Sequence, residues 1–524
     1  MRQSLFERLL DFFKITKEQY DHITRDVEIT DIPSFLNLPN ILEAVELVKN
    51  HIKNNKKILI YGDYDADGVM ATSILVKAFE YLDYKVNYYI PSRYLDGYGL
   101  NLANAEKLVK ANYDLIITVD NGISQIEPIQ YLRDNNIDVI VVDHHQEQEI
   151  LPNANYIFHP IISKYGDVTT SGGFMSFLFA SALLNRYDKY LSTLASISLV
   201  TDMMPLVSYN RDFLRAVIKN YTKGEFINID YLLEDDAFNE ESIGMKLGPK
   251  VNAVGRLIKD TTVNRVVKYF ISNDEKDIIT YYKWINAINE TRKEKTKDLK
   301  GEVLDDILNY GESHSISLIK EVEEGLIGLI ANSVMTTVKK PTVIFTREEK
   351  DPSKLKGSAR SMTGANIVEV FTLCKDFALS YGGHALAGGI TIYEKDFAKF
   401  KAIFEEYAKN HPTITTIDGL FIGIDEINEE NYHLIESFSP FGEGFKAPTL
   451  ILKRVKSDSL MYSKNKLHIN SRIGFNAKIV AFYPDMEVIG NNQYIDLYGN
   501  LRINTFKGSR YLQFNVKDIR PSTK

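Results

Sequence analysis

Short apolar runs rich in β-branched residues recur through the first third of the chain and alternate with stretches of helical spacing. The runs occupy residues 56–68, 86–93, 114–122 and 138–145. Buried strands that alternate with helices are typical of βαβ units, in which the strands are parallel. Three of these runs end in acidic or histidine residues. Because the carboxyl ends of parallel strands meet at one edge of the sheet, we expect these polar ends to converge in space.

The remaining chain divides into three regions by the same patterns. Residues 266–308 are polar, have helical spacing and contain no Pro, which predicts a long connecting helix. Residues 312–410 return to alternating strands and helices, and beyond 418 strand-like runs are separated by Gly and Asn turns. We therefore predict an α/β protein with a parallel-sheet domain over 1–265, a connecting helix over 266–311, a second α/β domain over 312–412 and a small β-barrel over 418–524.

Composition fits an ordinary globular protein. The chain has 524 residues, which at roughly 150 residues per domain suggests about three domains. Cys374 is the only cysteine, so no disulfide can form within the chain. Residues 1–20 lack the apolar core of a signal peptide, and no apolar run approaches the roughly 18 residues that span a membrane. We expect a cytoplasmic protein with no membrane contact.

The distribution of charge changes the meaning of the net charge of −8. Residues 446–524 carry 14 Lys and Arg against 5 Asp and Glu, a local balance of +9, so the rest of the chain sums to −17. A basic module attached to an acidic body suits a part that grips a polyanion joined to a part that binds metal. A module that is basic for solubility alone is the alternative.

Asp63, Asp65 and Asp67 place three carboxylates on alternate residues directly after the first predicted strand. Carboxylates at this density repel one another unless cations neutralise them, which favours a hard-metal site. The same spacing opens an EF-hand calcium loop, but Ile74 stands where that loop needs a bidentate Glu, and a strand rather than a helix precedes it. An acidic surface turn is the remaining alternative.

Further candidate ligands stand at the ends of later apolar stretches. Asp120 ends the third run and precedes an Asn-Gly pair, which by itself often marks only a turn. The segment Asp143-His144-His145 ends the fourth run, and imidazole mixed with carboxylates favours Mn²⁺ or Mg²⁺ over a thiolate-preferring ion. The second histidine can face a phosphate instead of the metal. Asp202 ends an apolar helical stretch, where a lone Asp is usually a helix-terminal residue.

The order of these segments resembles the four-motif pattern of the DHH phosphoesterase superfamily, over nearly the whole chain. That resemblance implies that His145 lies against the scissile phosphate and that Asp67 and Asp120 act with it in catalysis. Some superfamily members have a His where this chain has Tyr61. The implied ligands of a dinuclear Mn²⁺ or Mg²⁺ site are Asp63, Asp65, Asp67, Asp120, His144 and Asp202.

Other segments resemble the RecJ branch of that superfamily. Residues 90–100, which include Tyr98, and 248–257 match RecJ segments that shorter members generally lack. The glycine-rich segments 357–361 and 382–385 resemble the phosphate-gripping motifs of the DHH-associated domain. Glycine lets backbone N–H groups approach a phosphate, and Arg adds a bidentate fork. The resemblance implies that the 5′-terminal phosphate and nearby backbone are held by Arg93, Arg256, Ser358, Arg360 and His384.

The C-terminal region resembles the oligonucleotide-binding (OB) fold of RecJ through residues 438–445 and 504–508. Many relatives have Pro and Asn where Glu443 and Phe445 stand here, a departure within a linker-like turn. Aromatic side chains among basic ones can stack on bases and follow phosphates, although each aromatic can equally be barrel core. The candidates are Phe506, Lys507, Arg510 and Tyr511.

These features together predict hydrolysis of a phosphodiester by two cations roughly 3.5–4 Å apart, with Asp120 as the bridging carboxylate. No GxSxG elbow, HExxH helix or GxxxxGK[ST] loop is present, so serine hydrolase, zinc peptidase and nucleotide-driven motor are unsupported. The resemblance implies a 5′-to-3′ exonuclease on single-stranded DNA in repair and recombination, with a single-strand-binding protein and a helicase as partners. The alternatives are a phosphodiesterase for short oligoribonucleotides or cyclic dinucleotides, and a strand-binding module with a vestigial metal site.

Overall fold

The computed structural model describes residues 3–97, 99–258, 263–308, 313–413, 418–463, 468–473, 477–482, 484–506 and 509–522. Of the residues singled out in the sequence, Tyr98, Lys507 and Gly508 lie outside this part of the chain, as do the side chains of Phe506 and Arg510. The chain forms two compact units. One comprises residues 33–202 and 220–415, and the other comprises residues 1–32, 203–219 and 416–524.

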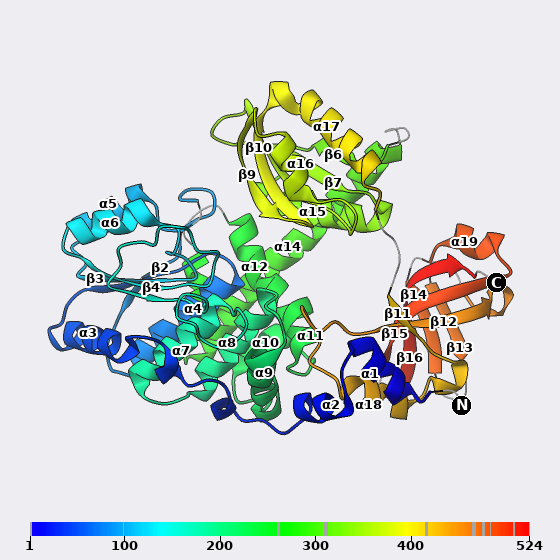
Figure 1. Cartoon of the computed structure of the whole chain (residues 1–524), viewed down its shortest axis with the longest axis horizontal. Coiled ribbons are helices and arrows are strands. Elements are labelled where there is room, and N and C mark those ends of the chain that lie inside the picture. The colour runs from blue at the N-terminus through cyan, green and yellow to red at the C-terminus, as the bar shows by residue number, and fades with distance from the viewer. Residues whose placement is uncertain are drawn as a thin grey trace. The chain divides into compact units, whose positions relative to one another are not determined.

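The first unit begins with a five-stranded parallel sheet of order β2-β1-β3-β4-β5. Its strands are β1 Ile58–Tyr61, β2 Asn87–Tyr89, β3 Leu115–Val119, β4 Asp138–Val142 and β5 Tyr156–Phe158. Helices lie on both faces, with α5 and α6 on one side and α4 and α7 on the other (Figure 1). The helices between residues 41 and 184 are α3 Ile41–Lys53, α4 Ala66–Glu80, α5 Leu102–Lys110, α6 Ile126–Asp134 and α7 Gly172–Leu184. Coverage of both faces explains why β1 and β3 are buried at every residue.

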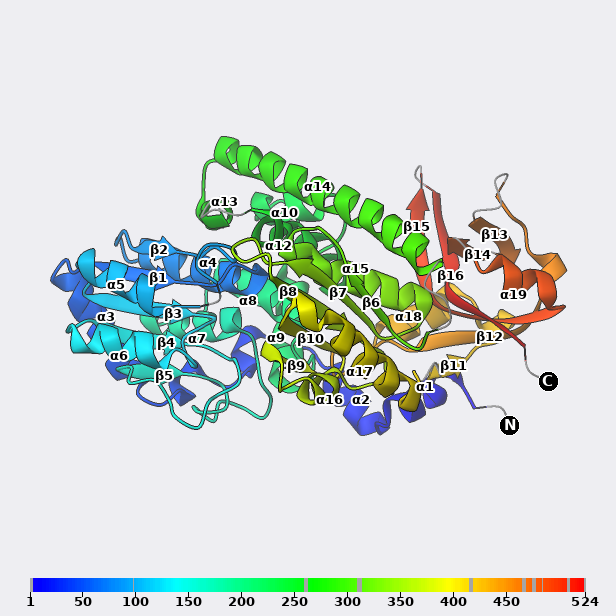
Figure 2. The same ribbon diagram turned by 90° about the horizontal axis from the view of Figure 1, so that it is seen from above.

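A helical layer completes this domain. It consists of α8 Lys189–Thr201, α10 Ile227–Leu233, α11 Glu240–Ser242, a π-helical turn at Ile243–Leu247, α12 Gly248–Leu257 and α13 Asn264–Ile271. The long connecting helix is α14, Glu275–Leu308 (Figure 2). It begins later than residue 266, because Asp274 accepts a hydrogen bond from the backbone N–H of Lys276 (2.8 Å) and so starts a new helix after α13.

The second α/β domain of this unit is a mixed sheet of order β6-β7-β8-β10-β9. Its elements are β6 Ile316–Ile319, α15 Glu324–Val338, β7 Thr342–Arg347, β8 Lys354–Arg360, α16 Ile367–Leu373, β9 Ala378–His384, β10 Ala387–Tyr393 and α17 Phe397–Asn410. Along β8 the odd residues are buried, whereas Lys356, Ser358 and Arg360 point to the other, more exposed face. Figure 2 shows α15 beside β7.

The other unit contains a six-stranded sheet of order β11-β12-β15-β16-β14-β13 with short helices. Its elements are α1 Leu5–Phe13, α2 Lys17–Ile23, α9 Ser208–Asn220, β11 Gly419–Phe421, α18 Glu429–Glu436, β12 Thr449–Lys456, β13 His468–Ile473, β14 Ala477–Phe482, α19 Met486–Asn491, β15 Tyr494–Phe506 and β16 Ser509–Pro521. The Phe13 ring stacks on Phe445 at 4.4 Å. The buried Arg211 donates hydrogen bonds to the carbonyls of Phe438, Ser439 and Pro440.

The predicted fold class is confirmed: a parallel-sheet domain, a long helix, a second α/β domain and a β-rich C-terminal domain follow in that order. The strand β5 was not anticipated, because its three residues are too few to show a period. In the part of the chain that the structure describes, no helix combines the length and the apolar character needed to cross a bilayer.

Candidate active site

Polar residues from three strand ends and one helix end meet at the carboxyl edge of the parallel sheet. The Nε2 atom of His144, after β4, lies 3.1 Å from Asp120 Oδ1, after β3. It also lies 3.4 Å from Asp202 Oδ2 at the end of α8 and 3.5 Å from Asp67 Oδ2 on α4. A second group, whose ligand atoms lie within 4.8 Å of one another, consists of Asp63, Asp65 and Asp120. All six predicted ligands are therefore brought together.

The first acidic segment folds into a tight turn between β1 and α4. Asp65 is the N-cap of α4, and its Oδ1 accepts a hydrogen bond from Gly68 N at 3.1 Å. A Cβ at Gly68 would lie 2.5 Å from the Asp63 carbonyl oxygen, so only glycine fits this turn. The turn brings carboxylate oxygens of Asp63 and Asp65 within 4.8 Å of each other, which their alternate spacing alone does not guarantee.

The amino end of helix α7 fixes the Asp67 carboxylate by hydrogen bonds. Its two carboxylate oxygens accept hydrogen bonds from Gly172 N (2.8 Å) and Gly173 N (2.7 Å), and one also accepts the hydroxyl of Ser198 on α8. The amino end of a helix favours negative charge. Asp120 adopts a left-handed backbone with φ of 59°, and a Cβ at Gly172 would come within 2.7 Å of its side chain. The two glycines therefore allow α7 to press against both carboxylates.

The crowding of acids perturbs their ionisation. Burial, followed by the charges of neighbouring carboxylates, holds the pKa of Asp63 and Asp120 well above the usual range and also raises that of Asp65. The same causes raise the pKa of Asp202 to about 9. Asp63 Oδ1 is buried and accepts no hydrogen bond from the described residues. Buried carboxylate oxygens that lack hydrogen-bond partners are suitable ligands for divalent cations, and bound cations would stabilise the ionised carboxylates.

His145 is paired with Asp143, which is buried below the site. The His145 Nδ1 atom lies 2.9 Å from Asp143 Oδ1, which also accepts the backbone N–H groups of His144 (2.7 Å) and His145 (3.2 Å). Burial opposes charge on both partners, but their hydrogen bond and mutual attraction outweigh it. The pKa of His145 is raised to about 9 and that of Asp143 is lowered to about 2. Both shifts favour a protonated His145 paired with an ionised Asp143.

Beside the acidic cluster lies a cavity of about 630 Å³ with a cationic lining. The Arg93 guanidinium lies 4.5 Å from the centroid of the Tyr64 ring, and Arg360 Nη1 donates to Ser358 Oγ at 3.0 Å. Burial, with the nearby charge of Arg93, lowers the pKa of Arg256 to about 10. Within the described residues none of the three arginines has a carboxylate within 4.0 Å, which favours an anionic ligand. The predicted residues in the lining are Arg93, Arg256, Ser358 and Arg360.

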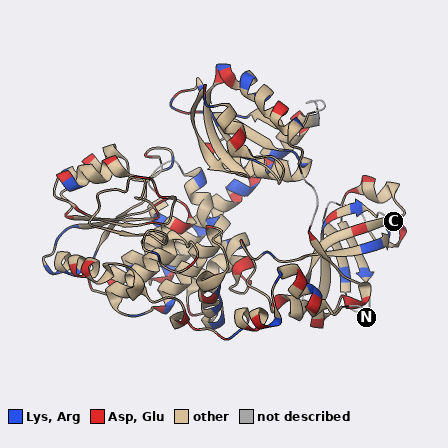
Figure 3. Cartoon of the chain, in the orientation of Figure 1, with Lys and Arg blue, Asp and Glu red and all other residues tan. Residues whose placement is uncertain are grey.

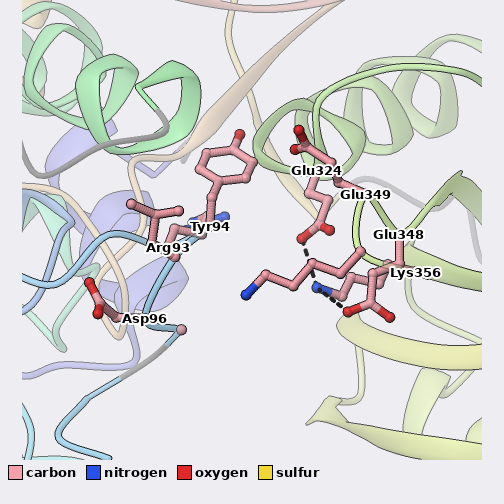
Figure 4. Close-up of a pocket in the computed structure, with 10 residues that line it drawn as sticks. Arg93, Tyr94, Asp96, Glu324, Glu348, Glu349 and Lys356 are labelled. Atoms are coloured by element: carbon pink, nitrogen blue, oxygen red, sulfur yellow. Dashed lines mark hydrogen bonds and ion pairs between the residues drawn. The ribbon is translucent and has the colours of Figure 1, made fainter. Parts of the chain in front are cut away.

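His384 occupies a different position. His384 on β9 pairs with Ala387 on β10, which in turn pairs with Arg360 on β8. His384 is nevertheless exposed and does not line the arginine cavity. A second cavity of about 350 Å³ adjoins Arg93 and Tyr94 (Figure 4). There Lys356 lies 3.0 Å from Glu324 and 3.6 Å from Glu348, so its charge is already compensated.

Sequence reasoning missed the residues that support the cluster. No role was assigned to Asp143, although it belongs to the Asp-His-His segment. Ser198 sits inside an apolar helix, where a serine gives no signal of its own. His159 directly follows β5, and recognition of that strand would have flagged it by the strand-end argument.

Comparison with known proteins gives three family matches: DHH family, N-terminal domain over residues 57–203, DHHA1 domain over 313–410 and RecJ OB domain over 418–518. The single-stranded-DNA-specific exonuclease RecJ of Bacillus subtilis is 27% identical over 95% of this chain, which covers 65% of that relative's length. The protein of the same name from Haemophilus influenzae is 27% identical, with 98% of this chain and 96% of the relative covered.

Solved structures agree on the fold. The Mn²⁺ complex of RecJ from Thermus thermophilus matches 99% of this chain and 78% of that chain, with a TM-score of 0.82 and 22% identity. A manganese-bound exonuclease RecJ matches 72% of this chain and 96% of its own, with a TM-score of 0.61 and 25% identity. The parallel sheet with its cluster of acids and histidines thus defines a phosphoesterase of the DHH class. Its second domain and its C-terminal domain narrow the assignment. The chain combines the DHH and DHHA1 domains with a RecJ OB domain, and it is similar to RecJ exonucleases over nearly its whole length.

Proposed function

We propose that this protein removes nucleotides from the 5′ end of single-stranded DNA as 5′ mononucleotides, by hydrolysis that depends on two divalent cations, Mn²⁺ or Mg²⁺. Two relatives that align with nearly the whole chain are named single-stranded-DNA-specific exonuclease RecJ. The six clustered ligands provide enough donors for two cations that share Asp120.

The observation that carries this proposal is the adjacency of the acidic cluster and the arginine cavity. Tyr64 lines the cavity and stands between Asp63 and Asp65 in the chain, so the cationic cavity begins where the acidic cluster ends. A terminal phosphate held by Arg93, Arg256, Ser358 and Arg360 would place the next phosphodiester over the carboxylates.

The chain's own residues would then act on the substrate as follows. With Nδ1 turned to Asp143, His145 would donate from Nε2 to a non-bridging oxygen of the scissile phosphate and stabilise its developing charge. Asp67, fixed by α7 and Ser198, and Asp120 would hold the divalent cations next to the phosphate. Bound cations would activate a water and stabilise the attacking and leaving oxygens.

The C-terminal domain supplies a basic surface suited to a longer strand. Lys and Arg recur along its strands (Figure 3). Cross-strand pairing aligns Arg472, Lys478, Gln513 and Arg502 in one row over four strands. The Lys478 ammonium lies 4.2 Å from the Tyr511 ring. Such a row can follow phosphates, and an aromatic beside it can stack on a base. A phosphodiesterase for short oligoribonucleotides does not need this surface.

We further propose a cytoplasmic role in DNA repair and recombination, in which a helicase unwinds the duplex and a single-strand-binding protein covers the product strand. A preference for single strands creates that requirement, because a nuclease of this kind needs another activity to open a duplex.

The test is digestion of a long 5′-phosphorylated DNA with Mn²⁺, as a single strand or a duplex, labelled at either end. We expect 5′-labelled mononucleotide first and little attack on a blunt duplex. Early release from the 3′ end, or equal attack on duplex, would contradict the proposal. Much faster cleavage of dinucleotides would favour the short-substrate alternative.

Variants separate catalysis from binding. Asp120→Ala and His144→Ala should abolish cleavage and retain affinity for the strand, measured by fluorescence anisotropy. Asp134→Ala, an exposed acid at the end of α6, is the matched control and should cleave normally. Full activity of the first two variants would refute the site.

A further inference from the structure

His159 follows β5 at the same carboxyl edge of the sheet and is completely buried. Its ring is engaged at both nitrogens. The backbone N–H groups of Ile161 and Ile162 point to Nδ1 at 3.2 and 3.4 Å, and Nε2 lies 2.7 Å from the carbonyl oxygen of His145. Because Nδ1 accepts, the proton of a neutral ring is on Nε2, which therefore donates to the His145 carbonyl.

The contact from His159 matters for His145 because His145 lies at the boundary between the buried end of β4 and an exposed loop. It follows the buried Asp143 by two residues, and the next residues, 146–151, form neither helix nor strand and are mostly exposed. Asp143 holds the His145 backbone N–H and Nδ1, at 3.2 and 2.9 Å. His159 holds the other end of the same residue, its carbonyl. The two contacts together fix the His145 peptide groups and the direction of its ring.

Neighbouring contacts keep His159 itself in place. Its backbone N–H lies 3.3 Å from the hydroxyl of Ser163, and the Ser163 N–H donates to the His159 carbonyl at 2.8 Å. This turn, together with the amides of Ile161 and Ile162, fixes the ring before any substrate binds. The position of the Nε2–H donor is thus set by local structure.

We propose that His159 is a positioning residue, whose Nε2–H holds the His145 carbonyl so that the His145 imidazole faces the scissile phosphate. This rests on the proposed function, in which His145 contacts that phosphate. A displacement of about 1 Å at a reacting group can lower a rate about 100-fold, so a lost anchor should appear in kcat. Binding of the strand depends on other residues and should not change.

Two isosteric substitutions test the donor. In His159→Gln the side-chain amide nitrogen reaches the place of Nε2 and can still donate to the His145 carbonyl. In His159→Asn the amide reaches only the place of Nδ1, so the contacts with Ile161 and Ile162 can persist while the donor to His145 is lost. We expect His159→Asn to lower kcat about tenfold or more, with KM and strand affinity within about twofold, and His159→Gln to retain most of kcat.

Three controls distinguish positioning from general packing. Thermal unfolding of both variants should be similar, and the Gln and Asn substitutions at His51, a half-buried histidine on α3, should leave kcat unchanged. In a His145→Ala background, with rates measured at excess enzyme, His159→Asn should have no further effect. Equal losses of kcat in His159→Asn and His159→Gln, or an undiminished loss in the His145→Ala background, would overturn the inference. Normal cleavage by His145→Ala itself would instead overturn the role of His145 in the proposed function.

Discussion

Replacing Gly173 by Ala probes how helix α7 is fitted to the acidic cluster. A Cβ at this position would lie 2.4 Å from Ser198 Oγ, 2.5 Å from Ser198 Cβ and 3.2 Å from Asp67 Oδ1. Ser198 donates to Asp67 and is itself bonded to the hydroxyl of Ser171, the N-cap of α7. The added methyl group must therefore displace the hydroxyl that fixes a predicted metal ligand.

The expected magnitude combines three effects. Overpacking of a buried site costs about 1–3 kcal/mol, and loss of a hydrogen bond to a charged group costs about 1.5–3 kcal/mol. Ala is better than Gly in a helix by at most about 1 kcal/mol. We expect Gly173→Ala to lower the free energy of unfolding by about 2–5 kcal/mol and to weaken Mn²⁺ affinity about 10- to 100-fold, as for other groups that orient metal ligands.

Gly301→Ala is the matched control. Gly301 lies within helix α14, and a Cβ there would meet nothing within 4 Å. This variant should be more stable by about 0.5–1 kcal/mol, with unchanged Mn²⁺ dependence. Urea unfolding gives the stabilities, and Mn²⁺ titration of strand cleavage gives the apparent metal affinity. If Gly173→Ala behaves like Gly301→Ala in both measurements, the contact between α7 and Asp67 does not support metal binding.

Three further outcomes follow from the structure. Burial raises the pKa of the Cys374 thiol to about 11, so a disulfide reagent at pH 8 should label it only after unfolding, and rapid labelling of the native protein would contradict its burial. Burial opposes ionisation of Glu405, but hydrogen bonds from His314 and Ser315 keep its pKa below the usual value. The stability gained from that carboxylate is present above about pH 4.5 and is lost as the pH falls through the lowered pKa. Glu405→Gln should therefore lower the free energy of unfolding at pH 7 by about 1–3 kcal/mol. In urea unfolding, the difference from wild type should become smaller toward pH 4. Arg211→Met leaves buried carbonyls without a donor and should lower the unfolding free energy of its unit by about 2–4 kcal/mol, whereas an unchanged melting temperature would show that water replaces the guanidinium.

Local sequence patterns predicted much of the candidate site. The strands that precede Asp63, Asp120 and Asp143 could be predicted because buried strands are short, apolar and rich in β-branched residues. Parallel strands in a βαβ fold must end at one edge, so the convergence of their polar ends followed from topology. Asp202 was weaker as a prediction, because the end of a helix does not by itself indicate which way the carboxylate points.

The exact limits of elements were less predictable. The long helix begins at Glu275, since the cap at Asp274 competes with continuation of α13. The strand β5, only three residues long, escaped detection, and with it His159. A periodic signal needs several residues to stand out, and short edge strands do not supply them.

The sequence by itself determined the fold class, the order of the domains and the set of clustered acids and histidines, because these depend on short periods and on residues at strand ends. Only the tertiary structure decided what holds them in place. Ser198 meets Asp67 across 131 residues, and His159 meets the carbonyl of His145 across 14. Such contacts depend on how helices and neighbouring strands pack against one another, and no local period in the sequence encodes that packing.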